Sequence, residues 1–226
     1  MPPSSRHLRT CSVPSIRTDH WGHQLLYRLL ISATLLADVA AAQSPDSARG
    51  LSRDVPACAA KAPSPRQAHA QCVDVGVRLA QSGRPAQAAE AFAFAAGLDS
   101  SDVDARYNAG LMLEVMGRHE RALQFFEDAA EIGAPDASLL WHIGANRYQL
   151  GVYAGARDAF LAALRQDSTD LQILVDLAVV EGRMGNTASA CIYWKDVASR
   201  GRKFLSGLPE DQRQSYERFF KTLTCS

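Results

Sequence analysis

The chain has 226 residues, enough for one or two domains with a sizeable buried core. Apolar residues make up 47% and charged residues 21%, which is the composition of an ordinary folded protein rather than a disordered one. The 24 basic and 24 acidic side chains balance to a net charge of zero, so no electrostatic signature of a nucleic-acid-binding or basic membrane-surface protein is present.

Residues 1–42 have the parts of a secretory signal peptide. Several arginines precede a short apolar run at residues 29–37, and the small-residue site Ala40-Ala41-Ala42 follows. The apolar run is too short for a transmembrane helix, so we expect no integral membrane span. This pattern predicts an exported protein, located in the periplasm or the cell envelope. The alternative is a cytoplasmic protein with a disordered N-terminal arm.

Residues 43–68 are rich in Pro and small residues, which predicts a flexible linker. From residue 69 the sequence repeats with a period of 34 residues. A period of this length is typical of a solenoid. The repeated columns are Gly76, Gly110, Gly144 and Ala178; Gly83, Gly117, Gly151 and Gly185; Ala88, Ala122, Ala156 and Ala190; Phe92, Phe126, Phe160 and Trp194; and Ala95, Ala129, Ala163 and Val197.

Each unit is predicted to be a pair of helices. In the third unit, Gly151 breaks the first helix and allows the chain to turn. A stripe of Ala156, Phe160, Ala163 and Leu164 then indicates a second, amphipathic helix. We expect the small columns to let the helices approach closely and the ring column to fill the space between one hairpin and the next. Segments 99–102, 134–136 and 167–170 supply N-cap residues for the following helices.

Spacing and residue types over about residues 69–202 resemble the tetratricopeptide repeat, a 34-residue helix–turn–helix. The match departs from the family pattern at the usual Trp position and at the usual closing Pro. The resemblance implies an all-α fold, a right-handed α-solenoid with a C-terminal capping helix. Its four repeats would span residues 69–102, 103–136, 137–170 and 171–204, with the cap in residues 205–226.

A solenoid of this kind needs its last apolar face covered. Residues 209–223 predict the capping helix, because Pro209 suits a helix start and Tyr216, Phe219, Phe220 and Leu223 form one apolar stripe. The alternative is an amphipathic helix that binds a partner.

Four cysteines follow the predicted leader. A cap antiparallel to the second helix of the fourth unit would bring Cys225 near Cys191, which predicts a disulfide between them. Cys58 and Cys72 are then paired mainly by elimination, and four buried free thiols are the alternative. A zinc site from Cys58, His69 and Cys72 is disfavoured, because strong zinc signals come as paired short spacings.

The family resemblance implies that the first helices of successive units line a concave groove. Rings with a few hydrogen-bonding groups suit such a groove, although Trp141 and Tyr148 could equally pack against neighbouring helices. Of the positions at which some family members clamp a C-terminal carboxylate, only Asn108 matches, which disfavours that role. The candidate groove residues are Tyr107, Asn108, Leu111, Trp141, His142, Tyr148, Asp176 and Arg183.

The sequence has no nucleotide-binding, hydrolase or metalloprotease motif, so we predict no catalytic residues, no bound metal and no cofactor. The predicted function is a non-enzymatic scaffold that binds another protein or a peptide segment in the groove, with no nucleic-acid partner. The alternatives are a structural repeat protein that assembles with its own copies, or a cytoplasmic adaptor of the same fold.

Overall fold

The computed structural model describes residues 58–59, 62, 64–223 and 225. The predicted signal peptide, residues 1–42, lies outside the described residues, as does most of the predicted linker, residues 43–68. The described residues form ten helices and no strand. Within this part of the chain, no helix combines the length and the apolar character that a membrane crossing requires.

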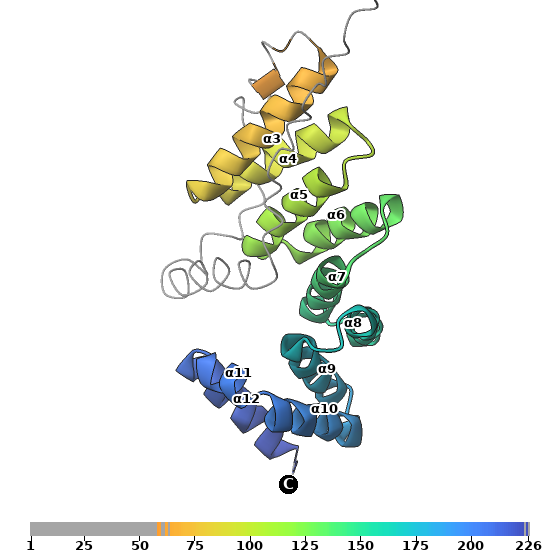
Figure 1. Cartoon of the computed structure of the whole chain (residues 1–226), viewed down its shortest axis with the longest axis vertical. Helices are drawn as coiled ribbons and strands as arrows, with labels where there is room; N and C mark the ends of the chain where they lie inside the picture. Colours follow the sequence, from red (N-terminus) through yellow and green to blue (C-terminus); the bar gives the residue numbers. More distant parts are fainter. Residues whose placement is uncertain (1–57, 60–61, 63, 224, 226) are drawn as a thin grey trace, which may run out of the picture. The chain divides into compact units, whose positions relative to one another are not determined.

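Four consecutive helical hairpins make up most of the described chain (Figure 1). Each helix from α3 to α10 packs against the next helix along the chain, which is the contact pattern of a solenoid. The all-α solenoid predicted from the sequence is therefore confirmed. The hairpins pair α3 (Pro65–Gln81) with α4 (Pro85–Leu98), α5 (Val103–Val115) with α6 (His119–Ile132), α7 (Ala137–Gln149) with α8 (Tyr153–Gln166), and α9 (Leu171–Arg183) with α10 (Thr187–Arg200).

The turn inside every hairpin has the same backbone geometry. In the third hairpin, Gly151 has a φ of 76°, a left-handed conformation that favours glycine. Its N–H donates to Tyr148 O at 2.9 Å, and the next N–H, of Val152, donates to Arg147 O at 2.8 Å. These two bonds form a Schellman motif, which satisfies the last carbonyls of α7. Equivalent bonds and positive φ values occur at Gly83, Gly117 and Gly185.

Aspartates start the first helix of three hairpins. Asp102 accepts a hydrogen bond from Ala105 N, Asp136 accepts one from Leu139 N, and Asp170 accepts bonds from the first turn of α9. Each carboxylate satisfies backbone N–H groups that have no partner inside the helix. The N-cap residues lie in the segments that the sequence predicts.

The first hairpin begins earlier than the predicted boundary at residue 69. Helix α3 starts at Pro65, because the Ser64 hydroxyl caps it by accepting from Gln67 N and because proline suits the first helical position. Cys58 and Ala59 are also helical. The stretch predicted to be a flexible linker therefore contains helical residues at its C-terminal end, because Ser64 and Pro65 there start a helix.

A glycine of the first helix and a phenylalanine of the second helix lie in close contact inside each of the first three hairpins. A methyl group added at Gly144 would lie 2.6 Å from Phe160 Cε1, and the corresponding distances are 2.7 Å at Gly76 and at Gly110. The ring therefore packs on the glycine of its own hairpin, not only against the next hairpin as the sequence predicts. In the fourth hairpin Ala178 replaces the glycine, and the Trp194 ring instead stacks on Phe220 with centroids 4.1 Å apart.

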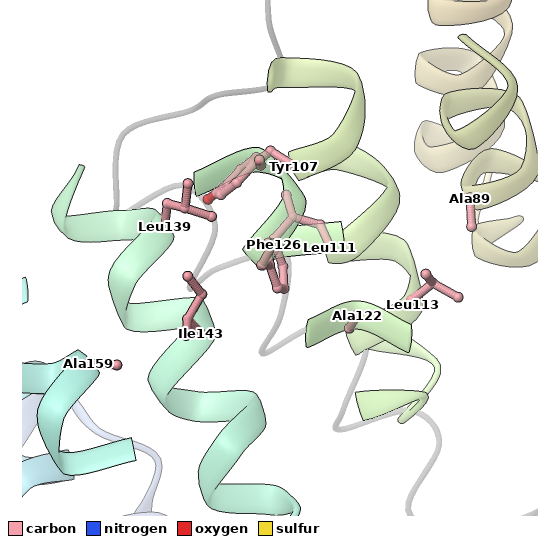
Figure 2. Close-up of a cluster of buried hydrophobic side chains, with 10 residues drawn as sticks. Ala89, Tyr107, Leu111, Leu113, Ala122, Phe126, Leu139, Ile143 and Ala159 are labelled. Carbon is pink, nitrogen blue, oxygen red and sulfur yellow. The ribbon is translucent and has the colours of Figure 1, made fainter. Parts of the chain in front are cut away.

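Clusters of buried apolar side chains connect neighbouring hairpins. Figure 2 shows the cluster between the second and third hairpins, in which Tyr107, Leu111 and Phe126 face Leu139 and Ile143. Phe126 is completely buried and stacks on His142 of the third hairpin, with ring centroids 5.1 Å apart. The Phe126 ring thus belongs both to its own hairpin and to the interface with the next one.

Two helices follow the four hairpins. The short helix α11 (Arg202–Gly207) crosses residue 204, the predicted boundary between the fourth repeat and the cap. The sequence does not predict this helix, because six residues are too few to show a helical period. Helix α12 (Glu210–Thr222) is the predicted cap. Its Phe220 is buried against Trp194 of α10, and Cys225, which follows α12, is bonded to Cys191 near the start of α10, so the two helices are antiparallel as predicted.

Replacing Gly144 by alanine should destabilise the fold by about 1–3 kcal/mol, because the new methyl group forces the buried Phe160 ring to move. The matched control is Gly97→Ala, also in a helix but with open space around its Cα, which should be neutral or stabilising by up to about 1 kcal/mol. Urea unfolding of both variants measures the difference. Equal free energies of unfolding for Gly144→Ala and the wild type would contradict the proposed role of the contact.

Candidate partner-binding surface

The eight candidate groove residues separate into two groups by burial. Tyr107, Asn108, Leu111 and His142 are only 1%, 4%, 7% and 5% exposed. They are core residues in this structure and do not line an open groove. Rings from α5, α6 and α7 cover one another here, with centroids 5.7 Å apart for Tyr107 and Phe126 and 5.5 Å apart for Tyr107 and His142.

His142 and its polar neighbours are buried, and hydrogen bonds within a network pair their polar atoms with one another. His142 Nδ1 lies 2.8 Å from Glu114 Oε2, and Asn146 Nδ2 donates to the same carboxylate oxygen at 3.1 Å. His119 Nδ1 lies 2.9 Å from Asn146 Oδ1 and continues the network to α6. Because buried polar groups are costly unless they are paired, this network favours one arrangement of the second and third hairpins.

Asn108 differs from the rest of the buried group. Its Oδ1 has no hydrogen-bond partner, and among the described residues it is the one buried side-chain oxygen or nitrogen in that condition. An unpaired buried acceptor costs free energy. The sequence places Asn108 among the groove residues, but its side chain is too deeply buried for direct contact with a partner in this conformation.

The second group lies at the surface of α7 and α9. Trp141, Tyr148 and Asp176 are half-buried, and Arg183 is exposed. Trp141 Nε1 donates to Asp176 Oδ2 at 2.7 Å, and Arg183 Nε donates to the Tyr148 hydroxyl at 3.3 Å. The two bonds join Trp141 and Tyr148 of α7 each to a charged side chain of α9. The Tyr148 hydroxyl, which accepts this bond, raises the pKa of Arg183 above its ordinary value.

Helix α12 contributes two further rings to the same surface. The guanidinium carbon of Arg183 lies 5.6 Å from the centroid of the Phe219 ring, a cation–π distance. Tyr216 packs against α9, where burial and the negative charge of Asp176 raise the pKa of its hydroxyl to about 12. Hydrogen bonds to Gln172 and Gln212 partly oppose this shift. The apolar stripe that contains both rings predicts a role in the cap alone.

We call this set the α7–α9–α12 surface. It combines half-buried rings with an exposed cation, and its hydrogen bonds run between successive first helices rather than within one helix. The cap comes after the fourth hairpin, in the place where the first helix of a further hairpin would lie beside α9. That position in the chain could have predicted that Tyr216 and Phe219 belong to this surface. The members of the surface are Trp141, Tyr148, Asp176, Arg183, Tyr216 and Phe219.

The four cysteines form two disulfides, Cys58–Cys72 and Cys191–Cys225, the pairings that the sequence favours. The three side chains of the disfavoured zinc site have other partners. Cys58 and Cys72 are bonded to each other, and His69 Nε2 lies 2.6 Å from Asp102 Oδ2. No group of three or more metal-ligating side chains occurs in the described residues.

Comparisons with known proteins agree with the repeat geometry. A tetratricopeptide-repeat family model matches residues 76–138, which span the turn of the first hairpin, the second hairpin and the start of the third. Over these residues the chain matches the tetratricopeptide repeat, the family whose repeat the sequence resembles. None of the curated proteins matches the sequence.

Solved tetratricopeptide-repeat structures share the fold at low sequence identity. YrrB, described as a TPR protein with an unusual peptide-binding site, is 17% identical, and the match covers 68% of this chain and 80% of YrrB with a TM-score of 0.56. MamA from Desulfovibrio magneticus RS-1 is 18% identical, with 66% of this chain and 92% of MamA covered and a TM-score of 0.57. Another MamA structure is 16% identical, with 69% and 89% covered and a TM-score of 0.59.

The raised pKa of Tyr216 predicts a pH dependence of stability. The folded protein keeps this proton up to about pH 12, whereas the unfolded chain releases it near pH 10.0, so the associated stabilisation is complete below pH 10 and is lost between pH 10 and 12. Tyr216→Phe should lose less stability over that interval than the wild type. Urea unfolding at several pH values tests this, and parallel curves for the two proteins above pH 10 would contradict it.

Proposed function

We propose that this tetratricopeptide-repeat protein is a non-enzymatic scaffold that binds a segment of another protein on the α7–α9–α12 surface. The observation that carries the proposal is Arg183, an exposed cation held between the Tyr148 hydroxyl and the Phe219 ring. Aromatic residues and arginine are the side chains most enriched at the energetic centres of protein interfaces.

The contacts of Arg183 favour binding in two ways. The bond to Tyr148 and the ring of Phe219 restrict the side chain before a partner arrives, so binding loses less conformational entropy. Only Nε is used by the Tyr148 bond, so the other guanidinium N–H groups can donate to carbonyl or carboxylate oxygens of a bound segment. The half-buried Trp141 and Tyr148 rings supply apolar area beside this cation.

The fold supports the same proposal. Tetratricopeptide-repeat proteins are generally scaffolds for protein–protein interaction, and YrrB carries a peptide-binding site on this fold. The low identity to YrrB transfers the architecture but no individual residue. For this chain, the binding role therefore depends on the α7–α9–α12 surface itself. We propose no catalytic activity, because the polar side chains gathered there are bonded to one another in structural pairs.

We also propose that the protein acts after export, in the periplasm or the cell envelope. The signal-peptide pattern of residues 1–42 supports this, and so does the geometry of two cysteine pairs close enough to be bonded. Disulfides form and persist mainly in oxidising compartments.

Arg183→Ala should weaken capture of the partner by about 5–30-fold, which corresponds to about 1–2 kcal/mol of binding free energy and exceeds the effect of most interface residues. The measurement compares the full chain, Arg183→Ala and Arg165→Ala as baits in extracts of the cell envelope. Arg165 is an exposed arginine on α8 and serves as the matched control. Proteins retained equally by the Arg183→Ala and wild-type baits would contradict binding at this surface.

The export proposal predicts a mature protein that begins at Gln43, directly after the small-residue site. N-terminal sequencing of the protein purified from its natural source measures this. A native chain that retains residues 1–42 would count against export through this signal.

A further inference from the structure

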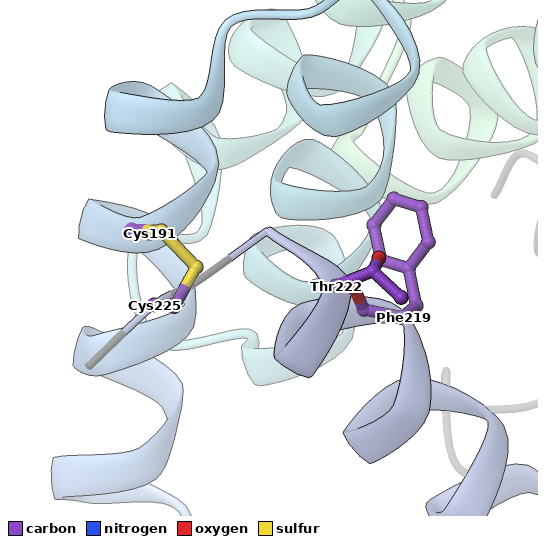
Figure 3. Close-up of a disulfide and its surroundings, with 4 residues drawn as sticks. All are labelled: Cys191, Phe219, Thr222 and Cys225. Carbon is purple, nitrogen blue, oxygen red and sulfur yellow. Dashed lines mark hydrogen bonds between the residues drawn. A yellow bond between two sulfur atoms is a disulfide. The ribbon is translucent and has the colours of Figure 1, made fainter.

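The C-terminal disulfide stands at the edge of the proposed binding surface. Cys225 follows α12, and Cys191 lies in the first turns of α10, so the bond joins the end of the cap to the fourth hairpin (Figure 3). At its other end, α12 is connected to α10 through α11. The cap is therefore covalently attached to the fourth hairpin at both of its ends.

Noncovalent contacts attach α12 much less extensively than the other helices. Phe220 is its one buried residue, stacked on Trp194. Tyr216 adds a partly buried ring to the cluster of Leu174 and Val175, while most other side chains of the helix are polar and exposed. A thirteen-residue helix with so little buried area is marginally stable unless something else holds it in place.

The two disulfides differ in their accessibility. Cys58 and Cys72 are 7% and 0% exposed, whereas Cys191 and Cys225 are half-buried. Thiol–disulfide exchange requires a thiolate to reach a sulfur atom in line with the bond, so access limits its rate. A soluble dithiol should therefore reduce Cys191–Cys225 well before Cys58–Cys72.

Release of α12 would dismantle one side of the α7–α9–α12 surface. Arg183 would lose the Phe219 ring, and Asp176 would lose the neighbouring Tyr216 hydroxyl. Gly182 would be uncovered as well, because a Cβ at that position would lie 2.7 Å from Phe219 and 2.8 Å from Leu223. Trp141 and Tyr148 would keep their bonds to α9, so only the side formed by α12 depends on the disulfide.

We propose that Cys191–Cys225 is a redox latch: the disulfide holds α12 in place and completes the binding surface, and its reduction releases the helix and weakens partner binding. This inference rests on the proposed function for its binding consequence. Reduction needs a dithiol. One thiolate attacks a sulfur and expels the other cysteine as a thiolate, which takes up a proton. The second thiol of the reductant then displaces the first cysteine, leaving two protein thiols and an oxidised dithiol.

The first test maps reduction and its structural effect in the full chain. Graded dithiothreitol followed by iodoacetamide and peptide mass analysis should label Cys191 and Cys225 at concentrations about tenfold below those that label Cys58 and Cys72. Hydrogen exchange should then rise in α12 while α5 and α7 stay protected. Reduction of both disulfides together, or unchanged protection of α12 after selective reduction, would overturn the latch.

The second test uses variants as baits in the cell-envelope extract. Cys191→Ser with Cys225→Ser should raise hydrogen exchange in α12 and reduce partner capture several-fold. Dithiothreitol at the selective concentration should have the same effect on the wild type, which separates latch opening from misfolding of the variant. The control, wild-type protein without reductant, must retain the partner.

The outcomes separate the latch from the proposed function. Equal capture by the oxidised and selectively reduced wild type, with α12 released, overturns redox control of binding but leaves the binding function intact. If the oxidised wild type captures no protein that Arg183→Ala fails to capture, the proposed function is overturned. Redox control of binding is then overturned as well.

Discussion

The contact between a glycine of the first helix and a phenylalanine ring of the second sets the geometry on which the rest of the solenoid depends. At Gly144 there is no room for one more carbon atom between the helix and Phe160. Because the ring also reaches the next hairpin, as Phe126 does by stacking on His142, a single side chain sets the packing both within a unit and between units. Repetition of this contact every 34 residues produces a solenoid.

The fourth hairpin lacks this contact, and its aromatic ring packs on the cap instead. Ala178 puts a methyl group where the other hairpins have none, and Trp194 stacks on Phe220 of α12. The departure that looks like degeneration of the repeat in the sequence is therefore a means of attaching the cap. It also places Phe219, the neighbour of Phe220, beside Arg183 and links the end of the solenoid to the proposed binding surface.

Local signals in the sequence predicted the fold well, because each depends on residues a few positions apart. Gly151 ends one helix through a left-handed turn, and Asp136 starts another by capping it, wherever the hairpin lies. The degree of burial of a first-helix side chain is different, since it depends on helices from the neighbouring units. The position of Tyr107 and His142 in the repeat predicts a place in the groove, but both are buried, in contact with each other and with Phe126 of α6. The contribution of α12 was missed for the same reason.

The positions of the disulfides follow from the energetics of a repeat array. An interior hairpin is stabilised by two neighbours, whereas the first and last hairpins of the array have only one. Cys58 precedes the first helix of the first hairpin and is bonded to Cys72 within that helix. Cys191–Cys225 joins the last hairpin to its cap. Each covalent bond therefore reinforces an end of the array, where a hairpin has one neighbouring hairpin instead of two. The first bond is buried in the core, whereas the second is half-buried and so more accessible to a reductant, at the end of the array where we propose that the binding surface is completed.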